Sequence, residues 1–189
     1  QAKKAWDAVS NAPDAAAAAF RKQREQSELA HRKRILLRRK HQFEAQKELS
    51  ESLGRKALKH TNIFRGQHEL PPIRWSQALH DIAAGHAMRM AKGRSPFSHA
   101  GFDRRVQRYP FPHSAAAENL AMNSGVPDCA GKAVEGWIHS PGHRKNLLGG
   151  FDLCGIAVAR SPSGEFYFVQ LFARSDPFSR IRNSVFPSR

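Results

Sequence analysis

Two histidines stand four residues apart in EGWIHSPGHRKNLL, residues 135–148, a spacing that could place two metal ligands on one helix face. Pro141 lies between them and has no amide hydrogen, so we expect the helix that carries His139 to end before it. Ser140 and Pro141 suit the N-cap and first position of a new helix, which would carry His143. The stretch also lacks the glutamate of the zinc-protease motif H-E-x-x-H. We therefore predict that these histidines belong to different helices and form no ligand pair.

The spacing of hydrophobic residues predicts the helices and strands around this stretch. In SQALHDIAAGHAMRMAKG, residues 76–93, apolar residues recur every three or four positions, which predicts a core-facing helix capped by Ser76. His86 lies on this apolar stripe, and we expect a buried structural histidine. The segments LCGIAVARS and EFYFVQLFAR, joined by PSG, predict a β-hairpin, and ENLAM predicts a short buried strand. Helices around a few antiparallel strands indicate an α+β fold.

Positive charge is concentrated in one segment near the beginning of the chain. The 189 residues carry a formal net charge of +15 at pH 7, and residues 20–59 alone hold 13 Lys and Arg against 5 Glu. This segment has no proline, no glycine before Gly54, many helix-forming residues and few apolar ones. We therefore expect residues 1–59 to form a basic helical arm outside the core. A second, smaller basic patch, expected on the surface, comprises Arg104, Arg105 and Arg108.

The basic arm suits an acidic partner, because Lys and Arg side chains attract phosphates and carboxylates. We expect an acidic protein surface or nucleic-acid phosphate within a larger assembly. Between residues 20 and 59 the only aromatic residues are Phe20 and Phe43, and no known nucleic-acid-reading motif follows. The residues expected to contact the partner lie at the centre of the arm: Arg32, Lys33, Arg34, Arg38, Arg39 and Lys40.

Other features of the sequence limit the class of protein. No run of about 18 apolar residues occurs, so no transmembrane segment is expected. Cys129 and Cys154 are too few for a disulfide scaffold; they could pair or stay free, and we expect free thiols. The few cysteines and the long arm favour an intracellular complex, with secretion as the alternative. Residues 175–189 contain two prolines and scattered apolar residues, which predicts a docking tail.

Seven motifs follow one another between residues 60 and 174: HTNIFRGQHELPPIRW, ALHDIAAGHAMRMA, FSHAGF, AAENLAM, AVEGWIHSPGHRKNLL, CGIAV and FYFVQLFAR. Together they resemble the CAP superfamily (cysteine-rich secretory proteins, antigen 5, pathogenesis-related-1), and the S-P-G-H-R motif is similar to its bacterial-type branch. The resemblance implies a three-layer α-β-α sandwich with a central antiparallel sheet. The expected organisation is a basic arm (1–59), a CAP-type domain (60–174) and a docking tail (175–189).

In the CAP superfamily a central cleft commonly holds two histidines and two acidic residues that can bind a divalent metal. Matched residue by residue, the resemblance implies His99, Glu118 and His143, whereas Ser140 stands at the fourth, acidic position. Two imidazoles and a carboxylate suit Zn²⁺ with one open position, but hydrolysis also needs a base to take a proton from bound water. The three residues could form a structural hydrogen-bond cluster, a metal site without catalysis, or a catalytic site. We expect the structural cluster.

The predicted function is therefore a non-enzymatic CAP-type domain that serves as an interaction or structural subunit of a larger assembly, anchored through its basic helix. The alternative is a divalent-metal-dependent hydrolase or a secreted lipid-binding effector of the CAP type.

Overall fold

The computed structural model describes residues 2–176, with side chains from Ala16 onward. Its chain divides into two compact units, one up to Ala45 and one from Gln46 onward. Helix α1 (Ala2–Gly66) contributes residues to both units. The helix continues to Gly66 because its residues favour helix and no proline follows Pro13 within it. Residues 46–59, predicted as part of the arm, belong to the second unit. Of the predicted tail, only Ser175 and Asp176 lie within the described residues.

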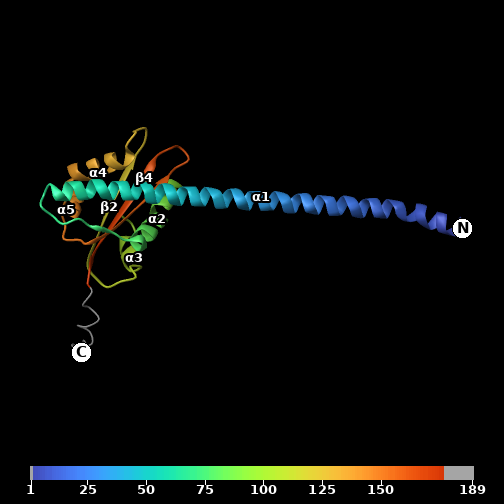
Figure 1. Ribbon diagram of the computed structural model, residues 1–189, viewed down its shortest axis with the longest axis horizontal. Helices are drawn as coiled ribbons and strands as arrows, with labels where there is room; N and C mark the ends of the chain where they lie inside the picture. The colour runs from blue at the N-terminus through green and yellow to red at the C-terminus, as the bar shows by residue number, and fades with distance from the viewer. Residues whose placement is uncertain (1, 177–189) are drawn as a thin grey trace, which may run out of the picture. The chain divides into compact units, whose positions relative to one another are not determined.

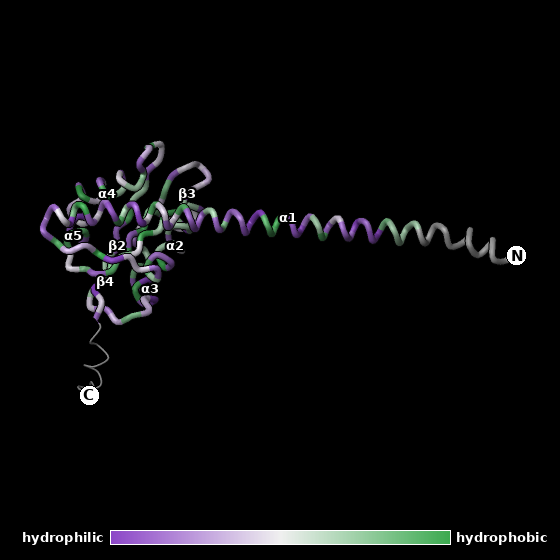
Figure 2. The backbone as a smooth tube through the Cα atoms, viewed as in Figure 1, coloured by the Kyte–Doolittle hydropathy of each residue, from purple (hydrophilic) through white to green (hydrophobic). Residues whose placement is uncertain are grey.

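The first unit consists of the arm helix, and its side chains from Ala16 to Ala45 are exposed. Its large apolar side chains share this exposure, with Phe20 and Phe43 each 67% accessible. Figure 2 shows mainly hydrophilic colours along this part of α1, interrupted by short hydrophobic stretches. No helix among residues 2–176 has the length and apolar character to cross a membrane.

The second unit contains one four-stranded sheet and the helices that cover it (Figure 1). After α1 the elements are β1 (Arg74–Trp75), α2 (Gln77–Ala91), α3 (Phe102–Val106), β2 (His113–Asn123), α4 (Cys129–His139), α5 (Pro141–Leu147), β3 (Leu153–Arg160) and β4 (Phe166–Ser175). The strand order is β1-β3-β4-β2, with β3/β4 and β4/β2 antiparallel and the two-residue β1 parallel to β3. The predicted hairpin corresponds to β3 and β4, and the predicted strand ENLAM is the second half of the longer β2.

The sheet has a hydrophobic cluster on each face, because successive side chains of a strand point to opposite sides. Along β4, Phe168 and Phe172 pack with the end of α1, with α4 and with α5, whereas Val169 and Leu171 pack with α2. Trp137 of α4 is only 1% exposed, and its Nε1 donates to the Leu120 carbonyl at 2.9 Å. The second unit is therefore an α-β-α sandwich, which confirms the predicted α+β fold class.

Helix α1 covers the outer edge of β3. Gln46 Nε2 donates to the Val158 carbonyl oxygen at 2.9 Å, and the Val158 amide donates to Ser50 Oγ at the same distance. One turn further on, a Cβ at Gly54 would collide with the Ile156 carbonyl oxygen, so only glycine allows this approach. Because β1 pairs only with the first two residues of β3, these α1 side chains satisfy backbone groups that no strand reaches.

Candidate functional site

The helices on either side of Ser140 separate the two histidines of the S-P-G-H motif. His139 is the last residue of α4, Pro141 is the first residue of α5, and His143 lies in the first turn of α5, all as predicted. Ser140 occupies the N-cap position of α5, but its hydroxyl makes no capping hydrogen bond; its carbonyl accepts from the Arg144 amide at 2.8 Å. Ser140 is therefore the N-cap residue, as predicted, although its side chain does not cap the helix.

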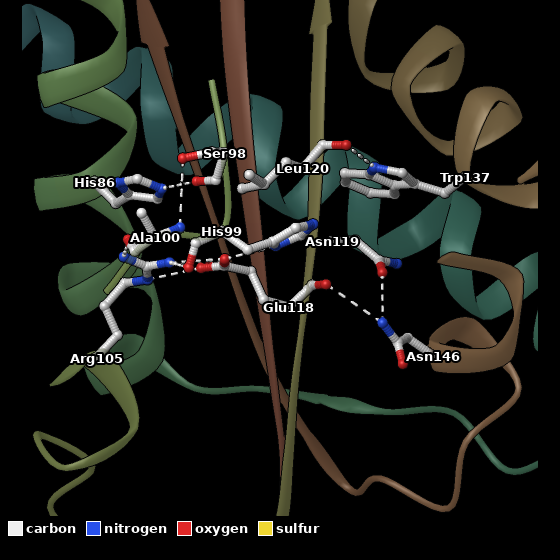
Figure 3. Close-up of polar contacts among 10 residues, drawn as sticks. All are labelled: His86, Ser98, His99, Ala100, Arg105, Glu118, Asn119, Leu120, Trp137 and Asn146. Atoms are coloured by element: carbon white, nitrogen blue, oxygen red, sulfur yellow. Dashed lines mark hydrogen bonds and ion pairs between the residues drawn. The ribbon is translucent and has the colours of Figure 1, made fainter. Parts of the chain in front are cut away.

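Glu118 of β2 is the centre of the candidate site, and its side chain is 2% exposed. Arg105 of α3 donates from Nε to one carboxylate oxygen and from Nη2 to the other, both at 2.7 Å. His99 Nδ1 lies 2.9 Å from Oε1 of the same carboxylate. Figure 3 shows both side chains meeting Glu118. Two parallel charge-assisted hydrogen bonds fix the orientation of a carboxylate.

Arg105 also holds the loop that carries His99. Its Nη1 donates to the Ala100 carbonyl at 3.0 Å and its Nη2 to the His99 carbonyl at 3.3 Å. On the other side of the loop, His86 Nε2 lies 3.0 Å from the Ser98 carbonyl oxygen. His86 is buried as predicted, and burial lowers its pKa, with the nearby Arg105 charge as the second cause. The loop is therefore held from both α2 and α3.

The burial of Arg105, 4% exposed, corrects its expected place in a surface patch. The sequence contains a signal for it, because Phe102, Arg105 and Tyr109 follow helical three- and four-residue spacing. Phe102 and Tyr109 both pack in the cluster beneath α2. Arg104 and Arg108 are exposed, as expected.

His143 is half-buried and approaches His99, with ring centroids 6.2 Å apart. Burial lowers the pKa of His143, and the charge of a protonated His99 lowers it further. The structure thus brings His99 into contact with Glu118 and His143 next to His99.

The three residues that the resemblance offers as metal ligands, His99, Glu118 and His143, do not suit a divalent cation in this arrangement. Both oxygens of Glu118 accept hydrogen bonds from Arg105, and a second positive charge there would face the buried guanidinium. Within the side chains of residues 16–176, no group of three or more His, Cys, Asp or Glu side chains is placed to hold a metal ion.

A buried polar network frames the site on its other side. Asn119 Nδ2 donates to Gln170 Oε1 at 3.1 Å and to the His143 carbonyl at 3.3 Å. Gln170 Nε2 donates to Thr61 Oγ1 at 3.2 Å. Asn146 Nδ2 donates to Asn119 Oδ1 at 2.9 Å, as Figure 3 shows. These bonds join α1, β4, β2 and α5, so the position of His143 is fixed by the core.

A second histidine cluster, not predicted from the sequence, has the order of a Ser-His-Asp triad. Ser50 Oγ lies 3.2 Å from His80 Nε2, and His80 Nδ1 lies 3.1 Å from Asp81 Oδ1. This is the geometry of a nucleophile, base and acid. However, Ser50 and His80 are only 4% and 2% exposed, and Ser50 Oγ also accepts from Val158. The cluster therefore joins α1, α2 and β3 as a structural link.

The two cysteines are free and buried, in agreement with the expected free thiols. Burial raises the pKa of the Cys154 thiol to about 12. A thiol that stays protonated at neutral pH is a poor nucleophile and a poor metal ligand.

The six basic residues predicted to contact a partner are all exposed. They lie between Leu29 and Phe43, a stretch of α1 without any Asp or Glu. Among residues 16–176, no acidic side chain forms an ion pair with any of the six, and the arm's ion pair nearest to them joins Arg24 to Glu28 at 3.3 Å.

Two proteins of Bacillus subtilis are similar to this chain in sequence. The chain is 32% identical to the uncharacterized membrane protein YlbC over 134 residues, which is 68% of this chain and 36% of YlbC. It is 28% identical to YkwD over 116 residues, 58% of this chain and 43% of that protein. The chain thus spans less than half the length of these two relatives.

Solved structures share the fold of the second unit. An extracellular protein from Bacillus anthracis that contains an SCP domain superposes with a TM-score of 0.56 at 31% identity, covering 69% of this chain and 43% of that chain. An outer surface protein of Borrelia burgdorferi superposes with a TM-score of 0.54 at 21% identity, covering 63% and 90%, and shows likeness in fold alone. Residues 58–172 match the sequence profile of the cysteine-rich secretory protein family, CAP. Since this match covers more than half of the chain, the protein belongs to the CAP family.

Proposed function

We propose that this chain is a non-enzymatic CAP-domain subunit that attaches to an acidic partner through its basic arm. The observation that carries the proposal is the cluster of six exposed Lys and Arg side chains between Leu29 and Phe43, with no acidic residue among them. Like charges gathered on one short helical stretch repel one another, and the repulsion disfavours the isolated arm. A partner with negative charge relieves this repulsion on binding.

The candidate site of the domain supports a structural role. Glu118 gives both oxygens to Arg105 and one also to His99, so it is not free to act as a general base. Ser140 stands where the family's fourth, acidic residue is expected. The serine of the second histidine cluster, Ser50, is enclosed by α2 and β3. In this proposal, the polar residues of the domain hold its layers together.

The proposal predicts that charge on the arm, and not the net charge of the chain, governs binding. We would replace all six central basic residues of the arm by Gln, which keeps good helix propensity. The matched control removes the same charge from exposed basic residues of the second unit: Lys92, Arg94, Arg104, Arg108, Lys145 and Arg160. Both variants should melt within a few degrees of the unsubstituted chain, since exposed substitutions change stability little.

Binding would be measured by fluorescence anisotropy against a labelled polyglutamate peptide and a labelled RNA duplex, over a range of salt concentrations. We expect the arm variant to bind its preferred probe about tenfold more weakly or worse, with a shallower salt dependence. The control variant should bind within about threefold of the unsubstituted chain. Equal losses in both variants would attribute binding to net charge, and no loss in either would place the contact elsewhere; both results contradict the proposal.

A further inference from the structure

The arm carries large apolar side chains at intervals of seven residues. Leu29, Leu36 and Phe43 are 54%, 63% and 67% exposed. Seven residues make about two turns of an α-helix, so side chains at this spacing lie along one face. In the part of α1 that belongs to the second unit, the same spacing falls on Ser50, Ala57 and Phe64, which are 4%, 0% and 6% exposed. There, the spacing marks a helix face that is covered by neighbouring elements.

Positive charges border this apolar row on both sides. Arg32 and Arg39 stand three residues after Leu29 and Leu36, whereas Lys33 and Lys40 stand four residues after them. Positions i+3 and i+4 of a helix flank the residue at position i on opposite sides. One face of the arm is therefore a row of two leucines and a phenylalanine between two rows of cations.

Resting on the proposed function, we infer that the acidic partner is an amphipathic helix of another protein. Its apolar side chains would pack on Leu29, Leu36 and Phe43, and its Glu or Asp side chains would meet the flanking Arg and Lys residues. Coiled-coil pairs are selected in this way, by apolar contact at the centre and opposite charges at the borders. The spacing of apolar side chains and the complementary charge together identify this partner class.

Other binding partners would contact only part of this helix face. A second copy of the arm would place its cations against the cations of the first, which disfavours pairing. Nucleic acid would pair with the cations but would leave Leu29 and Leu36 exposed, and proteins that bind single strands stack bases on aromatic side chains. Between Leu29 and Phe43 the only aromatic residue apart from histidine is Phe43 itself.

The test uses the full chain and a synthetic acidic helix of about four heptads, with Leu at the two central positions and Glu at the flanking positions. A peptide of the same composition in scrambled order measures the effect of charge alone. The apolar row is removed by Leu29→Gln, Leu36→Gln and Phe43→Gln, which leave every charge in place. The matched control replaces three exposed apolar residues of the arm outside the row: Phe20→Gln, Ile35→Gln and Leu37→Gln. Circular dichroism checks that both variants remain helical.

We expect the row variant to bind the acidic helix about tenfold more weakly or worse, and the control variant to bind within about threefold of the unsubstituted chain. The scrambled peptide should bind as weakly as the row variant binds the ordered one. Unchanged binding by the row variant, or tighter binding to an RNA duplex or to phosphatidylserine vesicles, would overturn the inference. If neutralising the six cations abolishes binding while removing the row does not, only this inference fails. If neither change matters, the proposed function fails with it.

Discussion

Arg105 and the basic residues at the centre of the arm carry the same charge in opposite surroundings. Arg105 is 4% exposed and makes four hydrogen bonds, two of them to Glu118. The six arm residues are exposed, without an acidic partner among residues 16–176. A buried cation is committed to one partner, because separating the pair leaves a charge without solvent or counter-charge. Exposed cations act by number and spacing, so they suit recognition of another molecule.

The largest expected effect comes from breaking the buried pair. Arg105→Ala leaves the Glu118 carboxylate buried without its bidentate partner, and we expect the free energy of unfolding to fall by about 3–5 kcal/mol. Urea denaturation followed by tryptophan fluorescence measures this loss. Replacing both members, as Arg105→Met with Glu118→Leu, removes the stranded charge and should recover most of the stability. A loss below about 1 kcal/mol in the single variant would show that the pair is not isolated from solvent.

We expect an intermediate loss of stability from a substitution in the part of helix α1 that belongs to the second unit, and almost none from one in the arm. Ser50→Ala removes the acceptor of the Val158 amide, and leaving this buried group without a partner should cost about 1–3 kcal/mol. Ser27→Ala changes an exposed serine of the arm in the same helix and should alter stability by less than about 0.5 kcal/mol. Denaturant unfolding of both variants gives the comparison. Equal effects would contradict a folding unit that begins near Gln46.

The smallest effect is a pH dependence from two histidines of the second unit. Burial lowers the pKa values of His86 and His143 below the ordinary value of 6.5, so the unfolded chain binds protons more readily than the folded one. Their contribution to stability is therefore complete above about pH 6.5 and is lost as the pH falls through the folded pKa values. Melting temperatures at pH 7.5 and 5.5 should show this decrease.

His143→Asn should reduce the decrease, since it removes one of the two titrating groups. The comparison stays above pH 5 because Asp128 and Asp152, whose pKa values are held below 3.8 by hydrogen bonds, contribute only at lower pH. A melting temperature that is constant or higher at pH 5.5 would contradict the direction of the two shifts.

The sequence predicted those helices and strands whose limits depend on residues close together in the chain. The proline at position 141 predicted the end of α4 and the start of α5, and the spacing of apolar residues predicted α2 and the hairpin. Contacts between distant residues were not predictable in this way. The Ser50–Val158 hydrogen bond joins residues 108 positions apart, and the hydrophilic composition of residues 46–59 conceals their place in the folded unit. Glu118 was found through family resemblance, whereas its partner Arg105 was missed because it was grouped with Arg104 and Arg108 as a charged surface patch.

The contacts of Gln46 and Ser50 with Val158 have a further consequence for the solubility of the domain. An uncovered edge strand offers its amides and carbonyls to strands of other molecules and promotes aggregation. The family match begins at residue 58, so a fragment cut there would lack the residues that shield the outer edge of β3. Residues 46–57 thus cover the edge of β3 and prevent strands of other molecules from pairing with it.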